Sequence, residues 1–220
     1  MRTTLRFFAA VLAIVLLVPT TSANAQRRRG LVEVSLPHQR HGFWLTLGAG
    51  AGSENYRYTN DTGCQGNLGA YQCDDKVKPS FFLAMGGTVS PHLRLGGEIH
   101  GWAWDRFSTS ANEKVTSYLV GGLLTGQVYP LRNAGLFAKV GLGISRSGES
   151  FEFSGNAGET GFAYMLGAGY ELKLSRSIFL TPVVSLMRHV STNPGQVQNL
   201  GTFHERLLTV GIGLTIQPGR

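Results

Sequence analysis

The sequence predicts an all-β fold: an eight-stranded antiparallel up-and-down transmembrane β-barrel. Segments of about ten residues alternate between apolar residues and small or polar ones, a signature that is weak in one segment and strong when repeated. The breaks between these segments are alternately short and long. The composition combines 30 glycines with only 15% charged residues, and the crowded interior of a small barrel favours small side chains.

The first 25 residues are expected to be a secretory signal peptide. Arg2 and Arg6 give a positive start, residues 7–18 are all apolar, and Ala23-Asn24-Ala25 is a small-residue cleavage pattern. The apolar run is too short for a spanning helix, which needs about 20 residues. We therefore predict a signal peptide at 1–25, a periplasmic N-terminal segment at 26–41, the barrel at 42–216 and a C-terminal tail at 217–220.

The first four expected strands are defined by apolar residues at every second position. Residues 43–53 carry Phe43, Leu45, Leu47, Ala49 and Ala51 on one face. Residues 80–89 carry Phe81, Leu83, Met85 and Val89, and residues 93–106 carry Leu93, Leu95, Ile99 and Ala103. Residues 115–129 carry Tyr118, Val120, Leu124 and Val128. The opposite faces are rich in glycine and polar residues, so we expect the apolar faces to contact lipid.

The last four expected strands repeat the pattern. Residues 136–146 carry Leu136, Ala138, Val140, Leu142 and Ile144, and residues 162–174 carry Phe162, Tyr164, Leu166, Ala168, Tyr170, Leu172 and Leu174. Residues 205–216 carry Leu208, Val210, Ile212, Leu214 and Ile216. The segment 178–189 is less regular. One frame turns Ile178 and Leu186 toward lipid and His189 toward the interior, whereas the opposite, more polar frame turns His189 outward.

The breaks predict the orientation of the barrel. Residues 90–92, 130–134 and 175–177 are short breaks with the proline or serine of tight turns. Residues 57–78, 107–114, 147–160 and 190–202 are longer and polar. Outer-membrane barrels place their short turns on the periplasmic side. An even number of strands then puts both termini in the periplasm, which agrees with export.

The expected interior carries charge, while the lipid-facing sides carry almost none. The inward charges form a candidate lumen network of Arg94, Glu98, Lys139, Glu171 and Lys173. These residues could line a narrow pore or form a salt-bridged plug. Eight strands leave an interior just wide enough for side chains, which favours the plug.

The charge and the cysteines limit the partners. The net charge of +7 includes the run Arg27-Arg28-Arg29, which is a basic patch for nucleic acid or a solvated tail. Export favours the tail, so no nucleic-acid partner is predicted. Cys64 and Cys73 are expected to form a disulfide in the oxidising periplasm. They have no Cys-x-x-Cys spacing and no histidine between them, so no metal and no cofactor is predicted.

From about Gly42 to Ile216, the chain resembles the outer-membrane β-barrel domain family, the OmpA/OmpX-like small barrels. The resemblance rests on glycine-rich alternating strands such as Leu47-Gly48-Ala49-Gly50, Val140-Gly141-Leu142-Gly143 and Val210-Gly211-Ile212-Gly213-Leu214. It implies a monomeric protein of the cell outer membrane. The implied partners are outer-membrane lipid and lipopolysaccharide, and an extracellular ligand bound through the outer loops. This non-enzymatic structural or binding role is the preferred interpretation.

The C-terminal end contains Arg188-His189-Val190-Ser191, then Asn193-Pro194-Gly195, and later Glu205. These residues resemble the corresponding part of the lipid A 3-O-deacylase family. The resemblance implies a nucleophile at Ser191, a general base at His189 and an orienting carboxylate at Glu205, the arrangement by which a weak hydroxyl nucleophile is activated. A hydrolase therefore remains the first alternative function and a narrow pore the second.

Overall fold

The computed structural model describes residues 40–58, 77–108, 113–132, 134–153, 155–191 and 202–217. The strands are β1 (Phe43–Tyr58), β2 (Val77–Ser90), β3 (Leu93–Ser108), β4 (Glu113–Val128), β5 (Leu136–Phe151), β6 (Gly155–Tyr170), β7 (Leu172–Lys173), β8 (Ile178–Ser191) and β9 (Phe203–Ile216). The expected signal peptide and the cysteine pair Cys64 and Cys73 lie outside the described residues. None of the described residues forms a helix long and apolar enough to cross a membrane.

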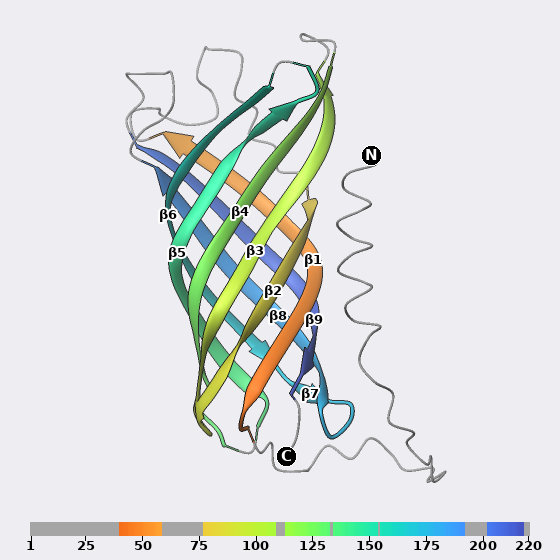
Figure 1. Ribbon diagram of the computed structural model, residues 1–220, viewed down its shortest axis with the longest axis vertical. Coiled ribbons are helices and arrows are strands. Elements are labelled where there is room, and N and C mark those ends of the chain that lie inside the picture. The colour runs from red at the N-terminus through yellow and green to blue at the C-terminus, as the bar shows by residue number, and fades with distance from the viewer. Residues whose placement is uncertain are drawn as a thin grey trace, which may run out of the picture. The chain divides into compact units, whose positions relative to one another are not determined.

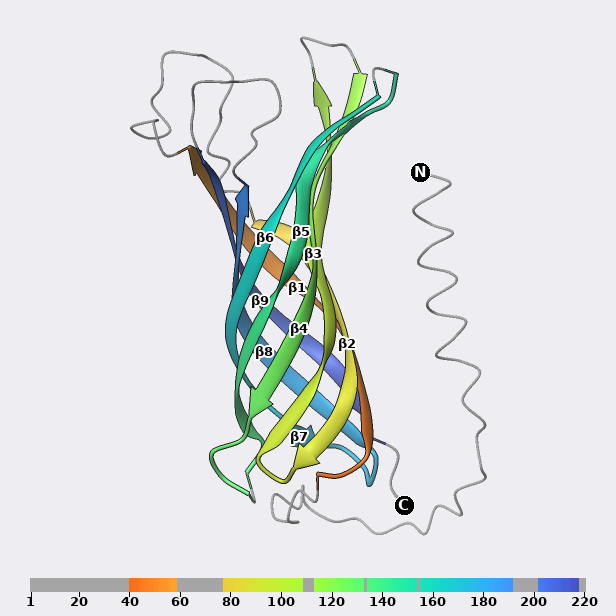
Figure 2. The same cartoon turned by 60° about the vertical axis from the view of Figure 1, so that its left-hand side comes forward.

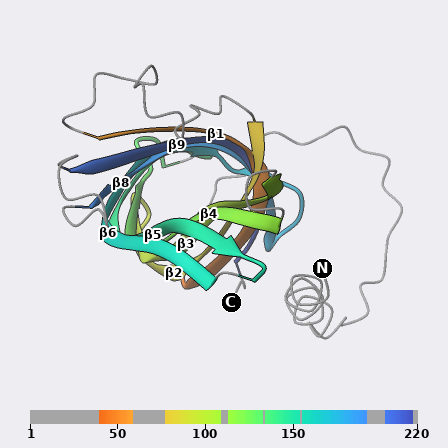
Figure 3. The same cartoon turned by 90° about the horizontal axis from the view of Figure 1, so that it is seen from above.

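The strands form one closed antiparallel sheet (Figure 1). Its order is β6-β5-β4-β3-β2-β1-β9-β8-β7, and an additional pairing between β6 and β8 closes it. Figure 3 shows the resulting ring from above. Because β7 continues the path of β6, these two elements count as one interrupted strand. The predicted eight-stranded barrel is therefore confirmed.

The interruption between β6 and β7 corrects the expected continuous strand 162–174. The ladder between β6 and β8 runs to Gly169 opposite Val183, and β7 resumes it with Leu172 opposite Leu180. The interruption therefore lies across from Pro182. Proline has no N–H to donate to a ladder. The N–H of Glu171 donates to the carbonyl of Gly135 on the other side, at 3.0 Å.

The two faces of the sheet follow the predicted alternation. Leu124, Ile144 and Val210 on the outside are 79%, 67% and 62% exposed. Large side chains on the opposite face, such as Trp44 and Met187, are completely buried. Apolar side chains therefore cover the outer surface, as lipid contact requires.

All eight spanning strands extend beyond their expected segments at the end away from the short turns. The predicted loop at residues 147–160 is wrong, because most of it is paired strand: Ser147 lies opposite Glu159 and Phe151 opposite Gly155. Figure 2 shows the β3–β4 and β5–β6 hairpins rising past the other strand ends, on the side away from the short turns. The residues of the extended β5–β6 hairpin are mostly polar. The hydrophobic alternation of these strands therefore ends before their backbone pairing does.

The interior holds two apolar clusters of buried side chains. One cluster contains Trp102, Leu119, Leu123, Ala163, Met165, Met187 and Leu207, and the other contains Phe82, Tyr129, Phe137 and Val183. Side chains from strands on opposite sides of the ring meet in these clusters. The barrel interior therefore contains a packed apolar core as well as buried polar and charged side chains.

Candidate functional site

The charged side chains in the barrel interior are the first candidate site. Four of the five predicted lumen residues are buried: Arg94, Glu98, Lys139 and Glu171. The structure divides these four into two groups, because Arg94 contacts Glu171 while Lys139 contacts Glu98. Lys173 lies in β7 and is half-buried, and no ion pair to it is found within the described ranges. The predicted single network is therefore two separate clusters.

One cluster lies at the short-turn end, which is the expected periplasmic end, and is called the periplasmic cluster: Arg40, Arg94, Gln127, Tyr129, Glu171 and Gln217. Arg94 forms an ion pair with Glu171. It also donates to the Tyr129 hydroxyl at 2.9 Å and to Oε1 of Gln217 at 2.6 Å. The Tyr129 oxygen lies 3.0 Å from an oxygen of Glu171. Burial raises the pKa of Tyr129, and the neighbouring Glu171 acts in the same direction, so this phenol remains a neutral hydrogen-bond donor.

Arg40 joins this cluster to the short turns. Its guanidinium lies 3.7 Å from the centre of the Tyr129 ring and 3.6 Å from Glu171. It donates to the carbonyl oxygens of Pro91 and Arg132, at 3.4 and 3.2 Å, and also to that of Ala134. One side chain thus links the β2–β3 turn, the β4–β5 turn and an interior carboxylate. Sequence reasoning missed Arg40 because it lies in the expected N-terminal segment, outside any strand pattern.

The central cluster comprises Glu98, His100, Lys139 and Thr209. Nζ of Lys139 lies 2.8 and 2.9 Å from the two carboxylate oxygens of Glu98. Nδ1 of His100 lies 3.1 Å from the same carboxylate, and Nε2 lies 3.2 Å from the Thr209 hydroxyl. The Phe82 ring stacks on His100 at a centroid distance of 6.0 Å. Both hydrogen-bonding positions of this imidazole are therefore occupied inside the barrel.

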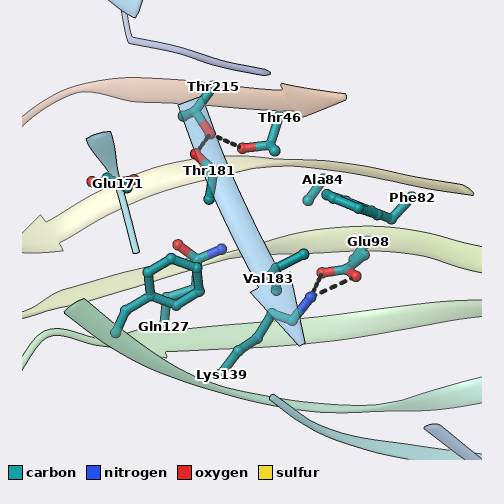
Figure 4. A pocket seen from close by; sticks show the side chains of 11 residues that line it. Thr46, Phe82, Ala84, Glu98, Gln127, Lys139, Glu171, Thr181, Val183 and Thr215 are labelled. Atoms are coloured by element: carbon teal, nitrogen blue, oxygen red, sulfur yellow. Dashed lines mark hydrogen bonds and ion pairs between the residues drawn. The ribbon is translucent and has the colours of Figure 1, made fainter. Parts of the chain in front are cut away.

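A small cavity lies between the periplasmic and central clusters (Figure 4). It is lined in part by Glu98, Lys139 and Glu171 and has a volume of about 10 Å³, which is room for about one water molecule. Thr46, Thr181 and Thr215 extend the polar lining through two hydrogen bonds of 2.8 Å. The cavity can hold a water molecule but not a substrate of ordinary size.

The outer cluster comprises Glu54, Lys78, Ser145, His189 and Glu205. Nζ of Lys78 lies 2.6 Å from Glu54 and 4.0 Å from the centre of the Trp102 ring. The buried carboxylate of Glu205 lies beside the carboxylate of Glu54 and the hydroxyl of Ser147. Neither of its oxygens has a partner in good hydrogen-bond geometry within the described part of the chain.

The three predicted catalytic residues face the interior. His189, Ser191 and Glu205 are 0%, 2% and 1% exposed, which settles the frame of β8. His189 lies directly opposite Glu205 in the β8–β9 ladder. However, Nδ1 of His189 lies 2.7 Å from the hydroxyl of Ser145, while Ser191 lies beside the carboxylate of Glu159. The structure therefore brings His189 and Glu205 together and joins a different serine to the imidazole.

Within the described segments, no group of three or more His, Cys, Asp or Glu side chains could hold a metal ion. These clusters supply ion pairs and buried hydrogen bonds, including the one between His189 and the Ser145 hydroxyl.

Comparisons with known proteins agree with this architecture. The sequence profile of the outer membrane protein beta-barrel domain family matches residues 13–179. No curated protein sequence matches the chain.

Solved structures give matches at low sequence identity. Neisserial surface protein A from Neisseria is 11% identical over 80% of this chain and 97% of its own, with a TM-score of 0.52. Ail of Yersinia pestis, solved with the heparin analogue sucrose octasulfate, is 11% identical over 80% of this chain and 99% of its own, with a TM-score of 0.48. At these identities, the likeness to the neisserial protein supports the barrel fold and carries no activity with it.

Proposed function

The chain belongs to the outer membrane protein beta-barrel domain family, and from this premise we propose that it is a closed barrel that does not conduct. Its role is to stabilise the envelope and to hold binding loops at the cell surface. The strand ends that flank the longer breaks meet at the end of the barrel away from the short turns, as Ser108 and Glu113 do in β3 and β4. Loops on a rigid scaffold are where binding residues concentrate. The proposed ligand site is therefore at the outer end, while the barrel serves as the anchor.

The filled interior is the single observation that carries this proposal. The periplasmic, central and outer clusters alternate with two apolar clusters along the barrel, and the cavity between them holds about 10 Å³. An eight-stranded barrel has space only for its own side chains. A conducting path would have to break buried ion pairs such as Glu98–Lys139, and breaking a buried pair costs about 3–5 kcal/mol.

Planar-bilayer recording tests the proposal. The barrel purified from outer membranes is expected to insert without conductance steps, whereas a general porin in the same preparation gives steps. Insertion is checked by the difference in gel mobility between heated and unheated samples. Stepwise conductance from the correctly inserted barrel would overturn the proposal and support the narrow pore.

A lipid A acyl-ester hydrolase is the second candidate. The observation that favours it is the direct cross-strand pairing of His189 with Glu205, together with the hydrogen bond between the Ser145 hydroxyl and His189. Its weakness is location, because a lipid substrate reaches the outer surface of a barrel and these side chains are buried inside it. Activity would require an acyl chain to enter between strands.

Mass spectrometry of lipid A separates the two candidates. Cells that express the wild type, Ser191→Ala or Ser145→Ala are compared with cells that lack the protein. The anchor proposal predicts four matching spectra. Loss of an acyl chain in cells with the wild type, but not in cells that lack the protein, would establish the hydrolase. The serine variant that abolishes this loss would identify the nucleophile.

A further inference from the structure

The outer surface of β8 and β9 changes from apolar to basic at one level. Counted from the short-turn end, the outward residues of β8 are Ile178, Leu180, Pro182, Val184, Leu186 and then Arg188. Those of β9 are Ile216, Leu214, Ile212, Val210, Leu208 and then Arg206. Each strand therefore presents five apolar positions before its first outward charge.

This change falls at the expected outer edge of the hydrocarbon. Ten residues separate Ile178 from Arg188, and ten separate Ile216 from Arg206. At a rise of about 3.3 Å per residue, that is about 33 Å along the strand. A tilt of about 40° reduces it to about 25 Å along the membrane normal, the usual height of the apolar band. Both guanidinium groups thus lie where the headgroups of the outer leaflet begin.

The two arginines lie side by side without an acidic partner. Arg188 and Arg206 are directly opposite each other in the β8–β9 ladder. Nη1 of Arg188 lies 3.4 Å from the Tyr164 hydroxyl of β6, and Tyr164 is the residue opposite Arg188 on that side. No carboxylate of the described residues forms an ion pair with either arginine. The nearest glutamate in sequence, Glu205, faces the interior.

Such a pair is unfavourable unless an anion lies between the charges. Like charges directly opposite each other destabilise a sheet, and this surface gives them no carboxylate. Guanidinium groups bind phosphate through two parallel hydrogen bonds. Near the hydrocarbon the dielectric constant falls, which strengthens both the repulsion and the attraction to an anion. The geometry therefore fits a phosphate held between two arginines.

We propose that Arg188 and Arg206 bind a phosphate group of a phosphorylated glycolipid in the outer leaflet. The Tyr164 hydroxyl is a third polar group at this site, and the acyl chains lie along Leu186 and Leu208 below it. The exposed apolar strip directly beneath the arginines is the reason to assign a lipid rather than a soluble phosphate. This inference goes beyond the proposed anchor role and holds whether or not the barrel conducts.

Native mass spectrometry of the purified barrel in detergent tests the site. The variants are Arg188→Gln, Arg206→Gln and the double variant, and the probe is bis-phosphorylated lipid A. Losing one charged hydrogen-bonding group is expected to weaken lipid A binding about tenfold, and the double variant is expected to weaken it further. Arg176→Gln is the matched control, because Arg176 is exposed in a short turn at the other end and its loss should leave binding unchanged.

Two further probes identify the ligand. Dephosphorylated lipid A should bind the wild type as weakly as lipid A binds the double variant, and inorganic phosphate should not compete at the same concentration. Equal binding of phosphorylated and dephosphorylated lipid would overturn the proposal. A loss of binding in Arg176→Gln equal to that in Arg188→Gln or Arg206→Gln would also overturn it. Competition by inorganic phosphate would exclude a lipid-specific site. Heat-dependent gel mobility confirms that each variant is folded.

Discussion

At the residue scale, Phe82 explains why three interior positions of β1 and β9 are glycine. Its ring lies inside the barrel, against backbone positions of two neighbouring strands. A Cβ at Gly48 would overlap that ring, and Cβ atoms at Gly211 and Gly213 would lie 3.2 and 3.1 Å from it. The glycines of β1 and β9 therefore make the space that a large interior side chain fills, as crowded small barrels require.

This packing predicts different effects on stability for two glycine substitutions. Gly48→Ala is expected to lower the free energy of unfolding by about 1–3 kcal/mol, because it overpacks the interior against Phe82. Gly122→Ala is the matched control on β4, where a Cβ meets nothing within 4 Å. It should leave stability unchanged or raise it by up to about 1 kcal/mol. Urea unfolding in lipid vesicles measures both, and equal destabilisation would contradict the assigned role of Phe82.

Strand parity predicted part of the interior chemistry and could not predict the rest. Alternation alone turned Arg94, Glu98, Lys139 and Glu171 inward, and all four are buried there. It could not reveal which of them pair, because pairing depends on the register between strands. Gln217 was assigned to a tail after the last strand, yet it accepts a hydrogen bond from Arg94. Residues beyond a periodic segment give no pattern from which their position could be inferred.

At the scale of elements, strand ends were the feature that the sequence predicted least well. Hydrophobic alternation reports where a strand meets lipid, not where its backbone pairing ends. The β5–β6 hairpin continues through polar pairs such as Ser150 and Asn156, whose side chains are 2.7 Å apart. Antiparallel pairing satisfies the backbone in water as well as in lipid. A polar strand extension therefore cannot be distinguished from a loop by hydrophobic alternation alone.

Shortening this hairpin should leave the barrel intact. Replacing residues 149–157 by a two-residue Asn-Gly turn joins Gly148 to Gly158, which lie opposite each other, with a turn suited to hairpins. We expect the fold and the thermal stability to be retained, because both apolar clusters and the central ion pair lie on other residues. Loss of heat-dependent gel mobility in the shortened protein would show that the extension contributes to folding. A same-length replacement by glycine and serine controls for composition.

At the scale of the whole molecule, side chains of the described residues fill the interior at more than one level. The periplasmic cluster ties the N-terminal Arg40 and the C-terminal Gln217 into the barrel, and Gln217 donates to the carbonyl of His41 at 2.6 Å. The Glu98–Lys139 pair and the cluster around Met187 are separate obstructions on other residues. The closed sheet was predictable from eight alternating segments, whereas these layers depend on contacts between distant strands.

Because side chains fill the interior at several levels, removing the Arg40 side chain should lower the stability of the barrel without making it conduct. Arg40→Ala deletes a guanidinium that contacts two turns and Glu171, and it leaves a buried carboxylate with one cation fewer. We expect a loss of about 1–3 kcal/mol in the free energy of unfolding, as for other lost hydrogen bonds to buried groups. Planar-bilayer conductance should stay at the wild-type level, because the central pair and the apolar clusters remain. Arg132→Ala, in the same turn region, is the control, since there only the backbone carbonyl contacts Arg40. Conductance steps in Arg40→Ala alone would mean that the periplasmic cluster is the sole barrier, and the layered interior would then be wrong.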